Sequence, residues 1–270
     1  MPDRPSDIFK QGTTLLKIFL PLFDWPDNKP EIQYKPTIIP SMERVLLIHR
    51  LAKMIFQLQT NHHPVRVAID GVDASGKTTL ADELAQVMQA GDRQIIRASV
   101  DNFHNPEHIR RKRGGLSPEG FYYDSYNYDA LENLLLKPLG PGGDRHYQTA
   151  VFDLIKDQPS ETPIETADHD AILLFDGIFL LRPQLESFWD LTVYIAADFD
   201  QTMARGIRRD AKLYGSVGIA AERYKKRYIP GQKQYHQQAN PLDKADILID
   251  NNDVETPKFL RVPAHLWTES

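Results

Sequence analysis

The sequence feature that most constrains this chain is a short glycine-rich segment that follows an apolar run. Residues 65 to 69 read V-R-V-A-I, and residues 71 to 78 read G-V-D-A-S-G-K-T, which matches the pattern G-x-x-x-x-G-K-[ST]. The β-branched residues before the glycines predict a strand, and the segment from about 77 to 90 predicts a helix. A turn from strand to helix is the structural context that this phosphate-binding pattern requires.

Each position of the pattern has a chemical role. Glycines at 71 and 76 let the backbone curl so that successive N–H groups point at one phosphate, and the following helix adds its positive N-terminal end. Lys77 places a cation against the β- and γ-phosphates, and Thr78 offers a hydroxyl to Mg²⁺. We therefore expect ATP and Mg²⁺ to bind here. The predicted ATP-binding residues are Gly71, Val72, Asp73, Ala74, Ser75, Gly76, Lys77, Thr78 and Thr79.

From residue 65 onward, predicted strands and helices alternate along the chain. The strand-like runs are 65–70, 94–100, 171–176, 191–196 and 246–250, and the helix-like segments are 77–90, 128–137, 199–213 and 217–228. Such alternation predicts an α/β fold, with a mostly parallel sheet and helices on both of its faces. The run at 171 to 176 is nearly all apolar, as expected of a strand that is covered on both sides.

The first forty residues differ from the rest of the chain. Seven prolines punctuate them, so we expect an extended N-terminal arm over 1–40. Residues 41–60 predict an amphipathic leading helix with Ser41 as its N-cap. Its apolar residues at helical spacing are Val45, Ile48, Leu51, Ala52, Ile55 and Phe56. The domain then extends over 41–270, with a core at 65–252.

Composition excludes several classes of protein. The 270 residues include no cysteine, which excludes a disulfide framework, thiolate zinc sites and cysteine nucleophiles, and is consistent with the cytoplasm. The net charge of −5 does not favour nucleic-acid binding. The apolar stretch at 15–23 is interrupted by Lys17 and Pro21, so we expect no signal peptide and no membrane span. A small-molecule substrate is the expected partner, and homo-oligomers stay open.

Two aspartates fall where strands of the predicted sheet end. Asp176 closes I-L-L-F-D and is placed to serve Mg²⁺ directly or through water. Asp101 follows the strand at 94–100, at the carboxyl edge where open α/β sheets bind ligands. A carboxylate at that position can accept a proton from a substrate hydroxyl that attacks the γ-phosphate. His104, three residues on, is a candidate for facing the substrate.

Taken together, these motifs resemble one family. G-V-D-A-S-G-K-T-T, V-D-N-F-H, L-F-D-G-I-F-L, A-R-G-I-R-R-D and K-A-D-I-L-I-D look like the uridine–cytidine kinase-like branch of P-loop kinases, in the family's order and at similar spacing. Phosphoribulokinase and the P-loop pantothenate kinases are more distant relatives. The resemblance runs from about Val65 to Asn252 and implies the three-layer P-loop NTPase fold with a lid.

The resemblance also implies roles for individual residues. It places the base that activates the nucleoside hydroxyl on Asp101 and the aspartate that holds the ribose on Asp124, with Asp129 as a weaker alternative. The metal-site acid falls on Asp176, where uridine kinases usually carry Glu. The lid helix resembles D-F-D-Q-T-M-A-R-G-I-R-R-D, which puts Arg205 and Arg209 on one helical face. Arginines that close over the transferring phosphoryl group neutralise its developing charge.

The chain departs from the family where the pyrimidine is read. The family pattern Y-D-x-x-x-H is replaced by F-D-L-I-K-D, so Phe152 stands in place of the tyrosine and Asp157 in place of the histidine. In the lid, Tyr214 and Ser216 replace two arginines. A site that reads a base by hydrogen bonds loses discrimination when those groups are removed. The parts for phosphoryl transfer are therefore present, while the base-reading parts are altered.

These observations leave three functions open. The first is an ATP- and Mg²⁺-dependent kinase for a small-molecule alcohol, with a nucleoside as the leading acceptor and a sugar phosphate, a vitamin or a nicotinamide riboside-like alcohol as alternatives. The second is an ATPase or nucleotide-dependent switch without an acceptor, and the third is a regulatory protein that only binds ATP. The basic run R-R-K-R-G-G at 110–115 is either a solvated loop or a contact for an anionic ligand.

Overall fold

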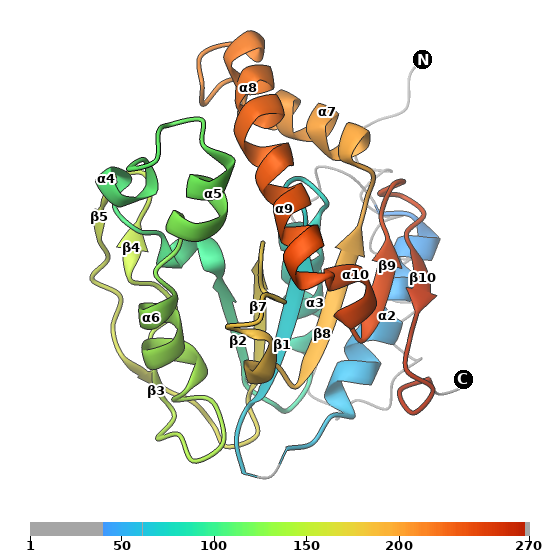
Figure 1. Ribbon diagram of the computed structural model, residues 1–270. Helices are drawn as coiled ribbons and strands as arrows, with labels where there is room; N and C mark the ends of the chain where they lie inside the picture. The colour runs from blue at the N-terminus through green and yellow to red at the C-terminus, as the bar shows by residue number, and fades with distance from the viewer. Residues whose placement is uncertain (1–39, 61, 268–270) are drawn as a thin grey trace, which may run out of the picture.

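The computed structural model describes residues 40–60 and 62–267. The predicted arm therefore lies outside the described residues, apart from Pro40. The central element is a six-stranded sheet with the strand order β10-β9-β8-β1-β7-β2 (Figure 1). Its strands are β1 (Val65–Gly71), β2 (Ile95–Ser99), β7 (Ile172–Gly177), β8 (Leu191–Ala196), β9 (Ile247–Asp250) and β10 (Lys258–Arg261). All neighbouring pairs are parallel except β9 and β10.

Helices cover both faces of this sheet (Figure 1). One face packs on α2 (Met42–Phe56) and α3 (Lys77–Met88), and the opposite face packs on α6 (Tyr128–Leu131), the π-turn η3 (Glu132–Leu136) and α9 (Ile229–Ala239). The remaining helices are α4 (Glu107–Arg110), α5 (Pro118–Asp124), α7 (Phe199–Asp210), α8 (Val217–Arg223) and α10 (Pro241–Lys244), with the π-turn η5 (Tyr224–Tyr228) and the 3₁₀ turns η2 (Val100–Phe103) and η4 (Glu186–Phe188). The three-layer α/β fold predicted from the sequence is confirmed.

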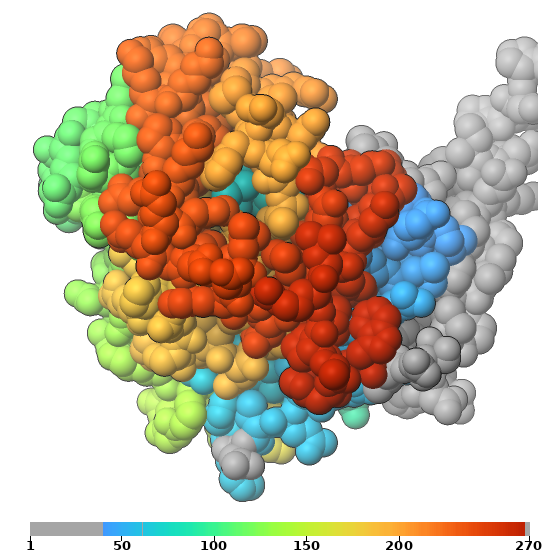
Figure 2. All heavy atoms as spheres, turned by 45° about the vertical axis from the view of Figure 1, so that its right-hand side comes forward, coloured from blue at the N-terminus to red at the C-terminus, as the bar shows by residue number. Residues whose placement is uncertain are grey.

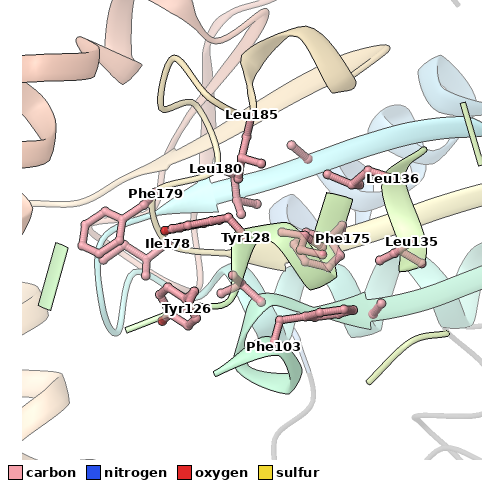
Figure 3. Close-up of a cluster of buried hydrophobic side chains, with 14 of the residues drawn as sticks. Phe103, Tyr126, Tyr128, Leu135, Leu136, Phe175, Ile178, Phe179, Leu180 and Leu185 are labelled. Carbon is pink, nitrogen blue, oxygen red and sulfur yellow. The ribbon is translucent and has the colours of Figure 1, made fainter. Parts of the chain in front are cut away.

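The two faces of the sheet carry separate apolar cores because side chains alternate along each strand. On β1, Val67 and Ile69 point toward α2 and α3, whereas Ala68 points to the other side. Figure 3 shows part of that second core, in which Phe103 and Phe175 lie near Leu135 of η3. Each core buries whole aliphatic and aromatic side chains, which stabilise the fold by roughly 1.5–3 kcal/mol apiece.

The leading helix forms where the sequence predicts it. Ser41 is the N-cap, and its hydroxyl accepts a hydrogen bond from the Arg44 amide at 3.1 Å. Of the residues predicted for its apolar face, Ile48, Leu51, Ala52 and Ile55 are fully buried. This helix therefore packs onto the sheet as part of the core.

Sequence reasoning predicted the parallel strands within one or two residues but missed several other elements. The helix predicted at 217–228 is α8 followed by η5, and it continues as α9 to Ala239 despite Pro230. In the π-turn the hydrogen-bond ladder changes register, so the missing N–H of Pro230 falls on a break in that ladder. The helix predicted at 199–213 ends at Asp210. β10, α5 and two small sheets, β3–β6 (His146–Tyr147 with Glu165–Thr166) and β4–β5 (Phe152–Asp153 with Gln158–Pro159), were not predicted.

Candidate active site

The candidate active site lies at the carboxyl ends of the parallel strands. The glycine-rich turn follows β1, Asp101 follows β2, Asp176 lies near the end of β7 and Asn251 directly follows β9. In the sheet register Asp176 is opposite both Ile69 of β1 and Ser99 of β2. Figure 2 shows a hollow between the amber atoms of α7 and the orange atoms of α9, with teal atoms of the segment around α3 at its floor.

The glycine-rich turn has the tight geometry of a phosphate cradle. A Cβ at Gly71 would lie 2.6 Å from Ser75 Oγ and 2.8 Å from the Ile195 carbonyl oxygen, so no side chain fits. Gly76 has φ of 99°, a left-handed conformation that disfavours residues with a Cβ. Asn251 Nδ2 donates to the Ser75 carbonyl at 2.6 Å and fills the space beside Gly76. Asn251 at the end of β9 thus holds the turn in place, and helix α3 begins directly after Gly76.

The Thr78 hydroxyl and the Asp176 carboxylate lie close together, as two ligands of one metal ion would have to. The Thr78 hydroxyl donates to Asp176 Oδ2 at 2.5 Å. The other oxygen, Oδ1, is buried and accepts no hydrogen bond from any described residue, although Arg97 Nη2 lies 2.7 Å away as an ion pair. Mg²⁺ in nucleotide sites takes one or two protein oxygens and completes its shell with phosphates and water. The hydroxyl and the carboxylate therefore fit Mg²⁺, with the positive charge of Arg97 as a competitor for Oδ1.

Lys77 and Asp73 connect the cradle to the rest of the site. Lys77 Nζ donates to the Val72 carbonyl at 3.2 Å, which folds the ammonium group over the turn. Burial raises the pKa of Asp73; the charges of Lys77 and Arg209 oppose this shift, whereas those of Asp101 and Asp210 add to it. These charges come from the cradle, from the turn that follows β2 and from helix α7.

Helix α9 braces the cradle from the other face of the sheet. The Asp73 amide donates to Gln232 Oε1 at 3.0 Å, and Gln232 is fully buried. The Tyr235 hydroxyl donates to Asp70 Oδ2, and Asp70 also accepts from the amides of Gly71 at 2.7 Å and Leu181 at 3.2 Å. Burial raises the pKa of Asp70 to about 6, against the opposing effect of these hydrogen bonds and of the Lys77 charge.

Asp101, the candidate base, is exposed at the start of the acceptor side. Its Oδ1 accepts from the Tyr126 hydroxyl at 3.3 Å, and its carbonyl oxygen lies 2.8 Å from His104 Nδ1. Burial raises the pKa of Tyr126 well above its ordinary value, and the negative charge of Asp101 raises it further. The phenol therefore keeps its proton and remains a hydrogen-bond donor. Burial lowers the pKa of His104, so its ring is neutral near pH 7. The structure therefore brings Asp101 and His104 together.

Asp124, predicted to hold a substrate hydroxyl, is buried and carries two ion pairs. Lys112 Nζ lies 3.0 Å from Oδ1, and Arg113 Nε donates to Oδ2 at 2.8 Å. Its carboxylate is thus shared with the basic run. Asp129, the weaker alternative, is exposed on α6. The role of Asp124 toward substrate stays a prediction.

The two residues at the altered pyrimidine-reading positions differ in their surroundings. Phe152 is buried in the short strand β4. Asp157 accepts hydrogen bonds from the Glu107 amide at 3.0 Å and from Arg110 Nη2 at 2.6 Å, so it holds the start of helix α4. An acid that already has these partners has fewer lone pairs left for a base edge.

The two predicted lid arginines are separated by the structure. Arg205 donates to the carbonyls of Asn251, at 3.0 Å, and Asn252, so it braces the end of β9. Arg209 is mostly exposed and donates to Asp210 Oδ1 at 2.7 Å. Its charge acts on Asp73 in the cradle. Both catalytic assignments stay predictions.

Several residues of this site were missed in the sequence. They are Asp70, Arg97, Tyr126, Gln232 and Asn251. Asp70 directly precedes Gly71, and Asn251 directly follows a predicted strand, so the rule that ligands bind at carboxyl ends of strands could have found both. No local pattern marks Gln232, because it reaches the cradle only through the packing of α9.

Two absences hold for the part of the chain that the structure describes. Residues 40–60 and 62–267 contain no helix that is both long and apolar enough to cross a membrane. The same residues contain no cluster of three or more His, Cys, Asp or Glu side chains able to hold a metal ion. Any Mg²⁺ at Thr78 and Asp176 would therefore depend on phosphate oxygens for further ligands.

Comparison with known proteins gives the family. Residues 66–253, more than half of the chain, match the cytidylate kinase-like family. The chain belongs to this family. The matched range contains the glycine-rich turn, Asp101, Asp176 and the predicted lid helix α7. The sequence-based assignment to P-loop kinases is confirmed.

Curated relatives of this cytidylate kinase-like protein include uridine and cytidine kinases. Uridine-cytidine kinase B of Dictyostelium discoideum is 27% identical over 56% of this chain and 61% of its own length. A uridine/cytidine kinase of Arabidopsis thaliana is 27% identical over 61% of this chain, but only 34% of its own length is covered. The uridine kinase of Lactobacillus helveticus is 29% identical over 71% of this chain and 90% of its own length.

Solved structures support the fold. The structure of a possible uridine kinase from Bacillus stearothermophilus has a TM-score of 0.61 at 21% identity, and the match covers 77% of this chain and 99% of that one. D-glycerate 3-kinase from Cryptococcus neoformans has a TM-score of 0.52 at 13% identity, with 80% and 97% covered. At such identities the likeness shows a common fold alone.

Proposed function

We propose that this protein is an ATP-dependent kinase that transfers the γ-phosphoryl group to a hydroxyl of a small molecule. One observation carries the proposal: the exposed carboxylate Asp101 lies two residues after Ser99, which is opposite Asp176 in the sheet, and Asp176 accepts a hydrogen bond from Thr78 of the phosphate cradle at 2.5 Å. A proton acceptor thus lies beside the phosphate cradle, where an attacking hydroxyl would have to be. Parts for holding ATP and a part for activating an acceptor occur in one site.

The residues of the chain divide the reaction between them. Asp101 accepts the proton of the acceptor hydroxyl as its oxygen bonds to the γ-phosphorus, while the bond from that phosphorus to the β–γ bridging oxygen breaks and ADP leaves. The backbone N–H groups of the turn and Lys77 hold the phosphates. Arg209 stabilises the charge on the transferring group. Thr78 and Asp176 would hold Mg²⁺, which neutralises charge on the β- and γ-phosphate oxygens when bound.

The acceptor is the less determined half of the proposal. The curated relatives are uridine or cytidine kinases, which favours a nucleoside as the acceptor. The altered residues at 152 and 157 weaken the case for a pyrimidine, since Phe152 lacks a hydroxyl and Asp157 caps helix α4. A sugar phosphate, a vitamin or a nicotinamide riboside-like alcohol is the alternative.

The test is acceptor-dependent ADP release from the purified chain with ATP and Mg²⁺. The panel contains uridine, cytidine, purine nucleosides, nicotinamide riboside, pantothenate, ribulose 5-phosphate and glycerate. Cytidine 5′-monophosphate is added as a control for cytidine, because it has no free 5′-hydroxyl to accept the phosphoryl group. Release that depends on an alcohol and is lost in Asp101→Asn supports the proposal. Release without any acceptor, unchanged in Asp101→Asn, would instead indicate an ATPase. ATP binding without release would indicate a regulatory protein.

A further inference from the structure

Arg227 is a buried cation that lacks an acidic partner. Its residue is only 6% exposed, and its Nη1 donates to the Ser117 carbonyl at 3.1 Å. Its guanidinium lies 5.6 Å from the centre of the Phe121 ring. No carboxylate of residues 40–60 or 62–267 lies within ion-pair distance of it, whereas the equally buried Arg44 and Arg66 pair with acids at 2.7 and 3.0 Å. A buried charge without a counter-charge is costly, so an anion is expected beside it.

Arg227 joins the helical segment that carries Arg223, four residues earlier, to the loop that follows Arg110 and Arg111, because its Nη1 donates to the carbonyls of Gly115 at 3.5 Å and Ser117 at 3.1 Å. Its pKa is lowered first by burial and then by the positive charges of Arg223, Arg111 and Arg110, although Tyr228 opposes the shift. Arg110 and Arg111 come from the end of helix α4, and Arg223 precedes η5. Two separate segments thus place like charges near one another, which costs free energy unless an anion joins them.

The basic run at 110–115 is divided by the structure. Lys112 and Arg113 both pair with the single carboxylate of Asp124, which balances one of their two positive charges. Arg110 pairs with Asp157 at 2.6 Å and Arg111 with Glu107 at 2.6 Å, so each of these two arginines has an acid of its own. Arg223 has no acidic partner among the described residues and instead stacks 4.5 Å from the Tyr214 ring centre. The excess positive charge therefore gathers at Arg227 and Arg223.

This arginine cluster, Arg110, Arg111, Arg223 and Arg227, lies beside the candidate base. Burial lowers the pKa of the His104 ring; the charge and the carbonyl of Asp101 oppose this shift, and the charges of Arg110 and Arg227 add to it. Arg110 Nε also donates to the carbonyl of Asn105, the residue after His104, at 2.6 Å. An anion at the cluster would thus be part of a molecule whose other end reaches Asp101.

We propose that the acceptor alcohol carries an anionic group, a phosphate or a carboxylate, and that the arginine cluster binds this group while Asp101 faces the hydroxyl. This inference rests on the proposed kinase function and narrows its acceptor. A nucleoside is neutral and would leave Arg227 buried without a counter-charge. The acceptor class is therefore an anionic alcohol.

The first test compares acceptors that differ only in the anion. The pairs are ribulose with ribulose 5-phosphate, glycerol with glycerate, and panthenol with pantothenate, so that phosphate and carboxylate are tested separately. We expect the anionic member of at least one pair to have the higher kcat/KM, by at least about tenfold, because hydrogen bonds to charged groups are the strong ones. A neutral acceptor, including a nucleoside, that outperforms every anionic one would overturn the inference while leaving the kinase function intact.

The second test removes the charge of Arg227. Arg227→Met should raise KM for the anionic acceptor roughly 10- to 100-fold and leave KM for ATP unchanged. Lys225→Met is the matched control, since Lys225 is exposed on the same π-turn, and it should change neither constant. Equal losses with charged and neutral acceptors would mean that Arg227 only anchors the loop at Ser117. Should Arg227→Met not fold, Arg223→Met, a partly exposed residue, tests the same cluster.

The third test measures anion binding independently of catalytic turnover. With a non-hydrolysable ATP analogue saturating the glycine-rich turn, inorganic phosphate and acetate are titrated while Tm and the NMR signal of His104 are followed. We expect one anion to raise Tm and to raise the pKa of His104 in the wild type and in Lys225→Met, but not in Arg227→Met. An identical response in Arg227→Met, or no response in any variant, would contradict an anion site, whatever the acceptor panel shows.

Discussion

The two halves of the site are built differently. The phosphate half is held from several elements: Asn251 fixes the Ser75 carbonyl, and Thr78 bonds to a buried Asp176. The acceptor half is more open, with Asp101 exposed and ion pairs that involve exposed arginines of the 110–115 loop. ATP presents the same phosphates to every P-loop kinase, whereas each kinase meets its own acceptor. The comparison teaches that the rigid half carries the common chemistry and the open half the specificity.

The largest effect should come from the phosphate half. Lys77→Ala removes the cation that faces the β- and γ-phosphates, so turnover should fall below detection and ATP binding should weaken. Isothermal titration with an ATP analogue and ADP release check both. Lys233→Ala is a control that removes one lysine charge from α9. Activity at the wild-type level in Lys77→Ala would remove the cradle from the mechanism.

The second prediction separates the two halves. Asp101→Asn removes only the proton acceptor, so kcat should fall by roughly 10²–10⁴ while ATP affinity stays within about twofold. The measurement is steady-state kinetics with the best acceptor, together with ATP-analogue binding. An equal loss of ATP affinity would show that Asp101 belongs to the phosphate half. Unchanged kinetics would show that it is not the base.

A third prediction concerns the buried brace between the cradle and helix α9. Because burial raises the pKa of Asp70 from 3.8 to about 6, the folded state binds this proton more tightly than the unfolded state. The contribution of Asp70 protonation to the free energy of unfolding is therefore fully present below about pH 3.8. This contribution, on the order of 3 kcal/mol, is lost as the pH rises through 6. Denaturant unfolding of wild type and Asp70→Asn from pH 4 to pH 7.5 should give curves that converge or cross. Parallel curves would show that Asp70 does not titrate in this range.

The smallest effect should come from Asn251→Ala. The change leaves the Ser75 carbonyl without its donor, and this should cost about 1–2 kcal/mol in stability and weaken ATP binding several-fold. Asn105→Ala is the matched control on the acceptor side, where Asn105 donates to the Asp124 and Tyr126 carbonyls. Thermal melts and ATP-analogue titrations of both variants test whether the bracing of the two halves is independent. A loss of ATP affinity in Asn105→Ala equal to that in Asn251→Ala would contradict it.

The sequence by itself determined the parallel strands of the sheet, the glycine-rich turn after β1 and the positions of Asp101 and Asp176 at strand ends. These follow from local patterns, because apolar runs, glycine spacing and the residue after a strand are read within a few positions. The family then became clear from the order of the motifs. The course of the chain through Pro230 could not be predicted, because a π-turn carries no local signal of its own.

Only the tertiary structure decided which charges have partners. The sequence shows a basic run at 110–115, but the structure pairs Lys112 and Arg113 with Asp124 and leaves Arg227, more than a hundred residues later, buried without an acid among the described residues. It likewise joins Asp70 to Tyr235 and Ser75 to Asn251 across the whole domain. Local patterns report what a segment prefers, whereas the electrostatic cost of a buried group depends on segments that meet only after folding.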